Sequence, residues 1–125
     1  MIRRLLVVDD EPDVRAVVSL SLQHVGGWEV VAVEGGLAGV DVARSGRLDA
    51  VVLDVMMPGT DGPATFRLLQ ADPRTADIPV VMLTARADRA AREDWLDMGV
   101  RAVLAKPFDP MDLPRQIGQV LGWSA

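Results

Sequence analysis

The sequence predicts a doubly wound α/β sandwich, in which helices cover both faces of a five-stranded parallel sheet. Short apolar runs alternate along the chain with longer segments of helical period, and this alternation is typical of such a fold. Three of the runs, LLVV, AVVL and VVML, are apolar almost throughout. Because strands buried on both faces lack the polar alternation of half-exposed strands, these runs indicate the interior of a parallel sheet.

Five strands and the helices between them are expected. The strands cover residues 3–9, 28–33, 50–54, 80–84 and 102–105. The first helix is expected to begin near Pro12 and to run to about Gln23, because proline is favoured in a first turn and Gly26 marks an end. The second helix is expected over residues 35–44, where Leu37 and Val40 recur at helical spacing.

The three later helices also have recognisable ends. Pro63 begins the third helix, and the fourth covers residues 89–98 before a glycine. The fifth is expected to begin at Asp109 and the proline that follows it. Its first turn should be distorted, because Pro114 removes a backbone donor early in the helix.

The composition indicates a single domain that fills residues 1–125 and lies in the cytoplasm. The chain has no cysteine, which suits a reducing compartment and excludes thiol catalysis and thiolate metal sites. The apolar run after Met1 is too short for a secretory signal, and no segment approaches membrane-spanning length. The net charge of -5 disfavours nucleic acid and anionic membranes as direct partners, because both require a concentrated basic face.

Polar residues follow four of the five expected strands. They are Asp9 and Asp10 where the first strand stops, Asp54 at the end of the third, Thr84 at the end of the fourth and Lys106 after the fifth. In a flavodoxin-like sheet of strand order 2-1-3-4-5, ligands bind at the carboxyl ends of the strands, where the order reverses. The first and third strands flank that point, so we expect the three carboxylates to lie within a few ångströms of one another.

Three crowded carboxylates need a compensating cation or a retained proton. A cluster of oxygen ligands without histidine or cysteine suits a hard ion, and Mg²⁺ typically binds one or two carboxylates, several waters and phosphate oxygens. An aspartate beside Mg²⁺ can act as a nucleophile toward phosphorus. The ammonium of Lys106 and the hydroxyl of Thr84 could hold oxygens of the incoming group. Taken singly, each residue is also explained as a helix cap, a turn residue or a surface residue.

These motifs together resemble the response-regulator receiver domains of two-component signalling, of the chemotaxis regulator type. The resemblance spans essentially the whole chain. It is carried by the acidic pair Asp9 and Asp10, by LDVMMPGTDG around Asp54, by VVMLTA with Thr84, and by KPF with Lys106. The combination of these motifs, more than any one of them, specifies the family.

The resemblance implies a role for each residue of the predicted site. Asp54 would be the phosphoacceptor. Mg²⁺ would be bound directly by Asp10, by Asp54 and by the backbone carbonyl of Met56, while Asp9 would act partly through water. The bond between Lys106 and its proline would be cis.

The resemblance also implies partners. A histidine kinase or a histidine phosphotransfer protein would donate the phosphoryl group, and the domain would be a signalling phosphoacceptor and not an enzyme. Thr84 would move toward the phosphoryl group and reshape the face made by the fourth helix, fifth strand and fifth helix for an unidentified downstream protein. A dimer that forms on phosphorylation is compatible with this scheme. The aromatic residue usual three positions before the lysine is Val103 here, so a ring flip is not expected.

Two other functions fit the sequence less well. A metal-dependent phosphatase with an aspartyl nucleophile typically carries a second aspartate two residues after the first, where this chain has Met56. A flavin-binding electron carrier needs a hydroxyl- and glycine-rich turn after the first strand, where this chain has DDEPD. The end of the chain soon after the fifth helix favours a stand-alone receiver over a fragment of a larger regulator or hybrid kinase.

Overall fold

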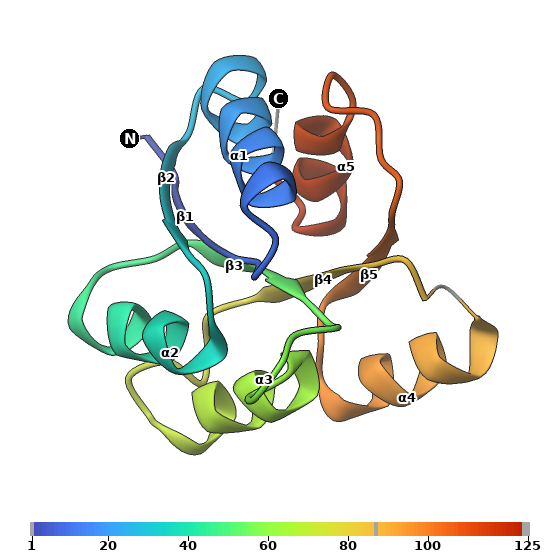
Figure 1. The fold of residues 1–125 in the computed structure, drawn as a ribbon. Helices are drawn as coiled ribbons and strands as arrows, with labels where there is room; N and C mark the ends of the chain where they lie inside the picture. The colour runs from blue at the N-terminus through green and yellow to red at the C-terminus, as the bar shows by residue number, and fades with distance from the viewer. Residues whose placement is uncertain (1, 87, 124–125) are drawn as a thin grey trace.

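The computed structural model describes residues 2–86 and 88–123 and contains a parallel sheet of strand order β2-β1-β3-β4-β5 (Figure 1). This is the order that the sequence predicts. The strands are β1 (Arg4–Val8), β2 (Glu29–Val33), β3 (Ala50–Asp54), β4 (Val80–Thr84) and β5 (Ala102–Ala105). Each begins and ends within one residue of its predicted bounds.

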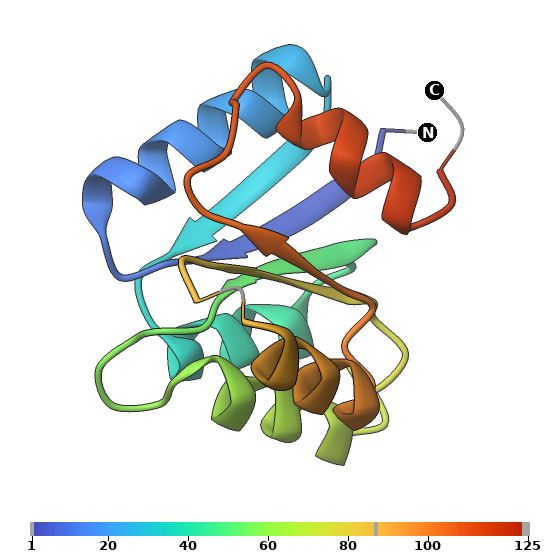
Figure 2. The same ribbon diagram turned by 90° about the vertical axis from the view of Figure 1, so that its right-hand side faces the viewer.

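The helices lie in two layers, one on each face of the sheet. They are α1 (Pro12–Leu20), α2 (Gly36–Ser45), α3 (Gly62–Ala71), α4 (Arg89–Met98) and α5 (Leu113–Val120). Figures 1 and 2 show α1 and α5 on one face and α2, α3 and α4 on the other. The predicted sandwich is therefore confirmed.

Successive residues of the buried strands feed two separate cores. Leu6, Val8 and Leu53 pack toward α2, α3 and α4, whereas their neighbours Leu5 and Val7 pack toward α1 and α5. Alternate residues of a strand point to opposite faces, so a strand covered on both sides must be apolar at every position. This is the physical origin of the continuous apolar runs in the sequence.

The first helix departs from regular α-helix before its predicted end. Residues Ser21–Val25 form a π-helical turn, in which the N–H of Gly26 donates to the carbonyl of Ser21 over 3.1 Å. The buried hydroxyl of Ser21 donates to the carbonyl of Pro110, so the turn ties α1 to the loop before α5. Gly26 is required here because a Cβ would lie 2.6 Å from the carbonyl of Leu22.

The last helix begins at Leu113, later than predicted. Residues 110–112 form a turn in which Asp109 accepts three hydrogen bonds of 2.9 Å. The N–H of Met111 donates to its carboxylate, and the N–H groups of Asp112 and Leu113 donate to its carbonyl. Pro114 consequently occupies the second position of α5, where a backbone donor has no intrahelical acceptor. The irregular backbone expected from Pro114 thus lies in residues 110–112, before α5 begins.

The predicted cis bond between Lys106 and Pro107 is confirmed. Trp95 is buried against the core, and His24 is exposed near the end of the π-helical turn. Over residues 2–86 and 88–123, none of the helices has both the length and the apolar character required to cross a bilayer.

Candidate functional site

The predicted acidic cluster forms at the carboxyl edge of the sheet. β1 and β3 are adjacent and parallel, with Val8 opposite Leu53, so Asp9 follows one strand where Asp54 ends the other. One oxygen from each of Asp9, Asp10 and Asp54 lies within 4.8 Å of the others. The structure therefore brings Asp54 beside an acidic pair that lies more than forty positions earlier in the sequence.

Asp9 is the acid whose hydrogen bonds are most nearly complete. Its side chain is 3% exposed. One carboxylate oxygen, Oδ1, accepts from the N–H of Glu11 at 2.9 Å, and the other, Oδ2, accepts from Lys106 Nζ at 3.1 Å. With both oxygens engaged by the protein, Asp9 is arranged to hold the lysine in place.

The ammonium of Lys106 joins the carboxyl ends of β1 and β3. This residue follows β5, its N–H donates to the carbonyl of Thr84 at 2.8 Å, and its Nζ lies 3.2 Å from Oδ1 of Asp54 as well as 3.1 Å from Asp9. Burial by itself would lower the pKa of Lys106, but the bond to Asp9 and the charges of both carboxylates outweigh it and leave this pKa above its ordinary value. The lysine is therefore positively charged at neutral pH.

Asp54 is held in an unfavourable electrostatic environment. Burial and, next, the like charge of Asp9 together raise the pKa of its carboxyl to about 6, although Lys106 opposes both effects. One ammonium faces three carboxylates in this cluster. The negative charge of the site is consequently only partly compensated by the protein.

Two carboxylate oxygens mark where a cation would fit. Within residues 2–86 and 88–123, Asp10 Oδ1 and Asp54 Oδ2 are buried side-chain oxygens for which the protein supplies no hydrogen-bond donor. A buried unpaired acceptor costs free energy, and a carboxylate costs more than a neutral group. Because both atoms belong to the same cluster of hard oxygen ligands, the residues present fit a divalent ion such as Mg²⁺.

Thr84 lies at the same edge, at the end of β4, with its side chain fully buried. Its hydroxyl oxygen accepts a hydrogen bond of 2.9 Å from the N–H of Arg86. The hydroxyl oxygen is thus bound to the loop that follows β4, and its O–H can still donate to an acceptor such as a phosphoryl oxygen. A groove beside the acids is lined in part by Met56, Arg86 and Trp95, and Met56 is 64% exposed.

Sequence reasoning missed Arg15, whose guanidinium reaches back to the acidic turn. Its Nη1 donates to the backbone carbonyl of Asp9 at 2.8 Å. A signal was present, because the N-terminal turns of a helix disfavour cations and α1 carries an arginine at its fourth position. A cation in that place indicates a local acceptor.

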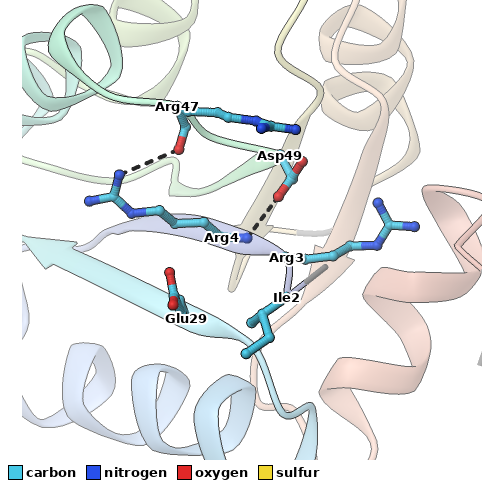
Figure 3. A pocket seen from close by; sticks show the side chains of 6 residues that line it. All are labelled: Ile2, Arg3, Arg4, Glu29, Arg47 and Asp49. Atoms are coloured by element: carbon cyan, nitrogen blue, oxygen red, sulfur yellow. Dashed lines mark hydrogen bonds between the residues drawn. The ribbon is translucent and has the colours of Figure 1, made fainter.

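A second cleft, of about 290 Å³, lies at the opposite edge of the sheet (Figure 3). Asp49 accepts there from the N–H of Arg4 at 2.8 Å, and Arg4 Nη1 donates to the carbonyl of Arg47 at 3.5 Å. Because guanidinium and carboxylate groups both line this cleft, it favours neither anionic nor cationic ligands. It is lined by Ile2, Arg3, Arg4, Glu29, Arg47 and Asp49.

Comparison with known proteins points to one family. Residues 5–118 match the model of the response regulator receiver domain. The chain is 37% identical over 121 residues to the phosphate regulon transcriptional regulatory protein PhoB of Klebsiella pneumoniae, covering 97% of this chain and 52% of that protein. It is 35% identical to the DNA-binding dual master transcriptional regulator RpaA of a Synechocystis strain, covering 94% of this chain and 48% of that protein. The chain thus spans about half the length of these relatives.

Solved structures give the same picture. The chemotaxis protein CheY4 of Vibrio cholerae superposes with a TM-score of 0.89 at 28% identity, covering 96% of this chain and 99% of that chain. A second structure is the receiver domain of the sensor histidine kinase PA1611 from Pseudomonas aeruginosa PAO1, which has a magnesium ion coordinated in its active site cleft. It superposes with a TM-score of 0.86 at 31% identity, covering 98% of this chain and 99% of that chain.

Proposed function

This chain belongs to the response regulator receiver domain family, and on that premise we propose that Asp54 is the residue that accepts the phosphoryl group. The single observation that supports this assignment best is the environment of its carboxylate. Lys106 binds one oxygen of Asp54, and the other oxygen is buried in the acidic cluster with no donor among the residues that the structure describes. Asp54 is thus both oriented by a cation and left with an oxygen free to react or bind.

Mg²⁺ is the cofactor of this proposal. It would be held by the carboxylates of Asp10 and Asp54 and by the backbone carbonyl of Met56, with Asp9 contributing partly through water. When bound, the ion would neutralise charge on the oxygens of the group being transferred. The hard oxygen ligands and the two unpaired buried oxygens support this choice of metal.

The other residues of the site have roles that their contacts support. One oxygen of Asp54 would form the new bond to phosphorus as the bond from phosphorus to the imidazole nitrogen of a phosphohistidine donor breaks. The imidazole would leave with the electrons of that bond and take up a proton from solvent. Lys106 would then pair with a phosphoryl oxygen, since its Nζ already lies 3.2 Å from the Asp54 carboxylate. The hydroxyl of Thr84, whose oxygen accepts from the N–H of Arg86, would move toward the phosphoryl group and donate to it, shifting the loop before α4.

The expected donor is a phosphohistidine of a histidine kinase or of a histidine phosphotransfer protein. Residues 1–125 would act as one receiver, which carries out chemistry on its own aspartate and on no other substrate. We place its output on the face of α4, β5 and α5, in contact with a protein partner or a second copy of the chain. The net charge of -5 supports a protein partner over nucleic acid for this part of the chain.

The test is incubation with acetyl phosphate and Mg²⁺, followed by intact mass measurement. Wild type should gain one phosphoryl group, and Asp54→Ala should gain none. Asp109→Ala is the matched control, because Asp109 lies near the same edge but outside the acidic cluster, and it should be phosphorylated like wild type. Phosphorylation of Asp54→Ala at the wild-type level would refute the assignment, provided that circular dichroism shows both variants folded.

A further inference from the structure

A positively charged side chain outside the predicted site is attached to the acidic turn. Arg15 lies on α1, and its Nη1 reaches back six residues to donate to the carbonyl of Asp9 at 2.8 Å. The rest of the residue is fixed by the helix, because its N–H donates to the carbonyl of Glu11 at 2.9 Å and its carbonyl accepts from the hydroxyl of Ser19 at 2.7 Å. A bond from a charged donor is stronger than one between neutral groups. Arg15 therefore joins the end of β1 to the start of α1.

The contact matters because Asp10 has little else to orient it. Asp9 is held by three hydrogen bonds. Its N–H donates to the carbonyl of Val33, and its carboxylate accepts from the N–H of Glu11 and from Lys106 Nζ. For Asp10 the situation differs, since its buried Oδ1 has no donor within the described residues. The direction of the Asp10 carboxylate consequently depends on the backbone of the turn that carries it. The carbonyl that begins this turn is the atom bound by Arg15.

Two effects of Arg15 on a bound cation oppose each other. Its positive charge near the acids should repel a cation and weaken metal binding. Its hydrogen bond should strengthen metal binding, because it holds the turn in the conformation that points Asp10 into the cluster. The two effects predict opposite outcomes when the side chain is made neutral, so experiment can separate them.

We propose that Arg15 is a positioning residue, which orders the Asp9–Asp10 turn so that the carboxylate of Asp10 is available to a divalent ion. The inference rests on the proposed function, in which Asp10 is a ligand of Mg²⁺. Positioning outweighs charge repulsion in this account, because the hydrogen bond is short and partly buried. Residues that orient metal ligands commonly change metal affinity by about 10-fold or more.

The experiment is calorimetric titration of MgCl₂ into wild type, Arg15→Gln and Arg15→Met. Both neutral variants should bind Mg²⁺ roughly 10-fold more weakly than wild type. Arg15→Met retains the length of the apolar stem, which guards against a loss of packing. The matched control is Arg67→Gln on α3, which removes an equal charge from an exposed arginine remote from the acids and should bind Mg²⁺ like wild type. Equal or tighter binding by both Arg15 variants would overturn the proposal.

A second readout distinguishes positioning from general damage. At limiting Mg²⁺, phosphorylation of Arg15→Gln by acetyl phosphate should be slower than that of wild type, and saturating Mg²⁺ should restore the wild-type rate. A rate that stays low at saturating Mg²⁺ would contradict a role through the metal ligand. Failure of wild type itself to bind Mg²⁺ would instead refute the proposed function, so the two failures are distinguishable.

Discussion

The two edges of the sheet carry charged residues in opposite ways. At the carboxyl edge, three buried or half-buried carboxylates share Lys106, and two of their oxygens find no donor among the residues described. At the amino edge, the charged groups reach donors and acceptors: Asp49 is bound by the N–H of Arg4, and Asp72 by Arg44 and Arg74. The first edge concentrates like charge, whereas the second disperses it into pairs.

This difference indicates that the carboxyl edge is built to bind a ligand, whereas the charges of the amino edge have no such role. Buried unpaired acids cost free energy, and a fold retains them where a ligand relieves the cost. Paired and exposed charges cost little and contribute little. Substitutions at the carboxyl edge should therefore have large effects that depend on a cation, and substitutions at the amino edge should have small effects that do not.

Removal of Lys106 should produce the largest loss of stability. In EDTA at neutral pH, Lys106→Met should lower the free energy of unfolding by about 3 kcal/mol, because it leaves Asp9 and Asp54 buried without their cation. Urea denaturation measures this change. The double variant Asp9→Asn/Lys106→Met should recover part of the loss, since one of the two uncompensated charges is then absent.

The amino edge supplies the control for this experiment. Arg47 is exposed and lines the cleft at that edge, so Arg47→Met should change the free energy of unfolding by no more than about 0.5 kcal/mol. Equal losses for Lys106→Met and Arg47→Met would remove the distinction between the two edges.

A substitution of Met56 tests the carboxyl edge through the rate at which the phosphoryl group is lost from Asp54. Its exposed side chain lies beside the acids in the groove that also contains Arg86, where it should limit the approach of water to a phosphoryl group on Asp54. An amide at this place could orient a water molecule for attack. Met56→Asn should therefore lose its phosphoryl group several-fold faster than wild type, measured by intact mass after the donor is removed. Met111→Asn, which changes a methionine that is 71% exposed elsewhere, should match wild type, and an unchanged rate in Met56→Asn would oppose this role.

Asp72 should show the smallest effect and a characteristic pH dependence. Hydrogen bonds from Arg74 hold the pKa of Asp72 well below its ordinary range, with Arg44 adding to the effect. A carboxyl whose pKa is lower in the folded state stabilises the protein above its unfolded pKa, and this contribution is lost as the pH falls toward the folded value. Asp72→Asn should therefore melt slightly below wild type at neutral pH, and the difference should shrink as the pH is lowered below about 4. A difference that persists in acid would mean that the ion pair is not its cause.

Much of the fold and of the acidic cluster was predictable from the sequence. The continuous apolar runs indicate strands with two covered faces, and the rule that parallel strands meet at one edge brings Asp10 and Asp54 together without any knowledge of their side chains. These features follow from periodicity and topology, which are properties of the pattern and not of individual atoms.

Other features depend on side-chain positions that a sequence pattern does not contain. The attachment of Thr84 to Arg86, the division of Lys106 between two carboxylates and the reach of Arg15 to Asp9 are of this kind. The π-helical turn at Ser21 has the same origin, because it depends on the contact between its hydroxyl and the loop before α5. Helical period alone predicts a regular helix there.

The claim that the carboxyl edge is costly until a cation binds can be measured directly as the free energy of unfolding in Mg²⁺ and in EDTA. Wild type should gain about 2 to 3 kcal/mol in Mg²⁺ at roughly one hundred times its dissociation constant. Asp54→Asn should be more stable than wild type in EDTA by roughly 1 to 3 kcal/mol, because burial raises the pKa of the wild-type carboxyl, and it should gain little from Mg²⁺. Wild type that is equally stable in Mg²⁺ and EDTA, with Asp54→Asn no more stable than it in EDTA, would contradict the account.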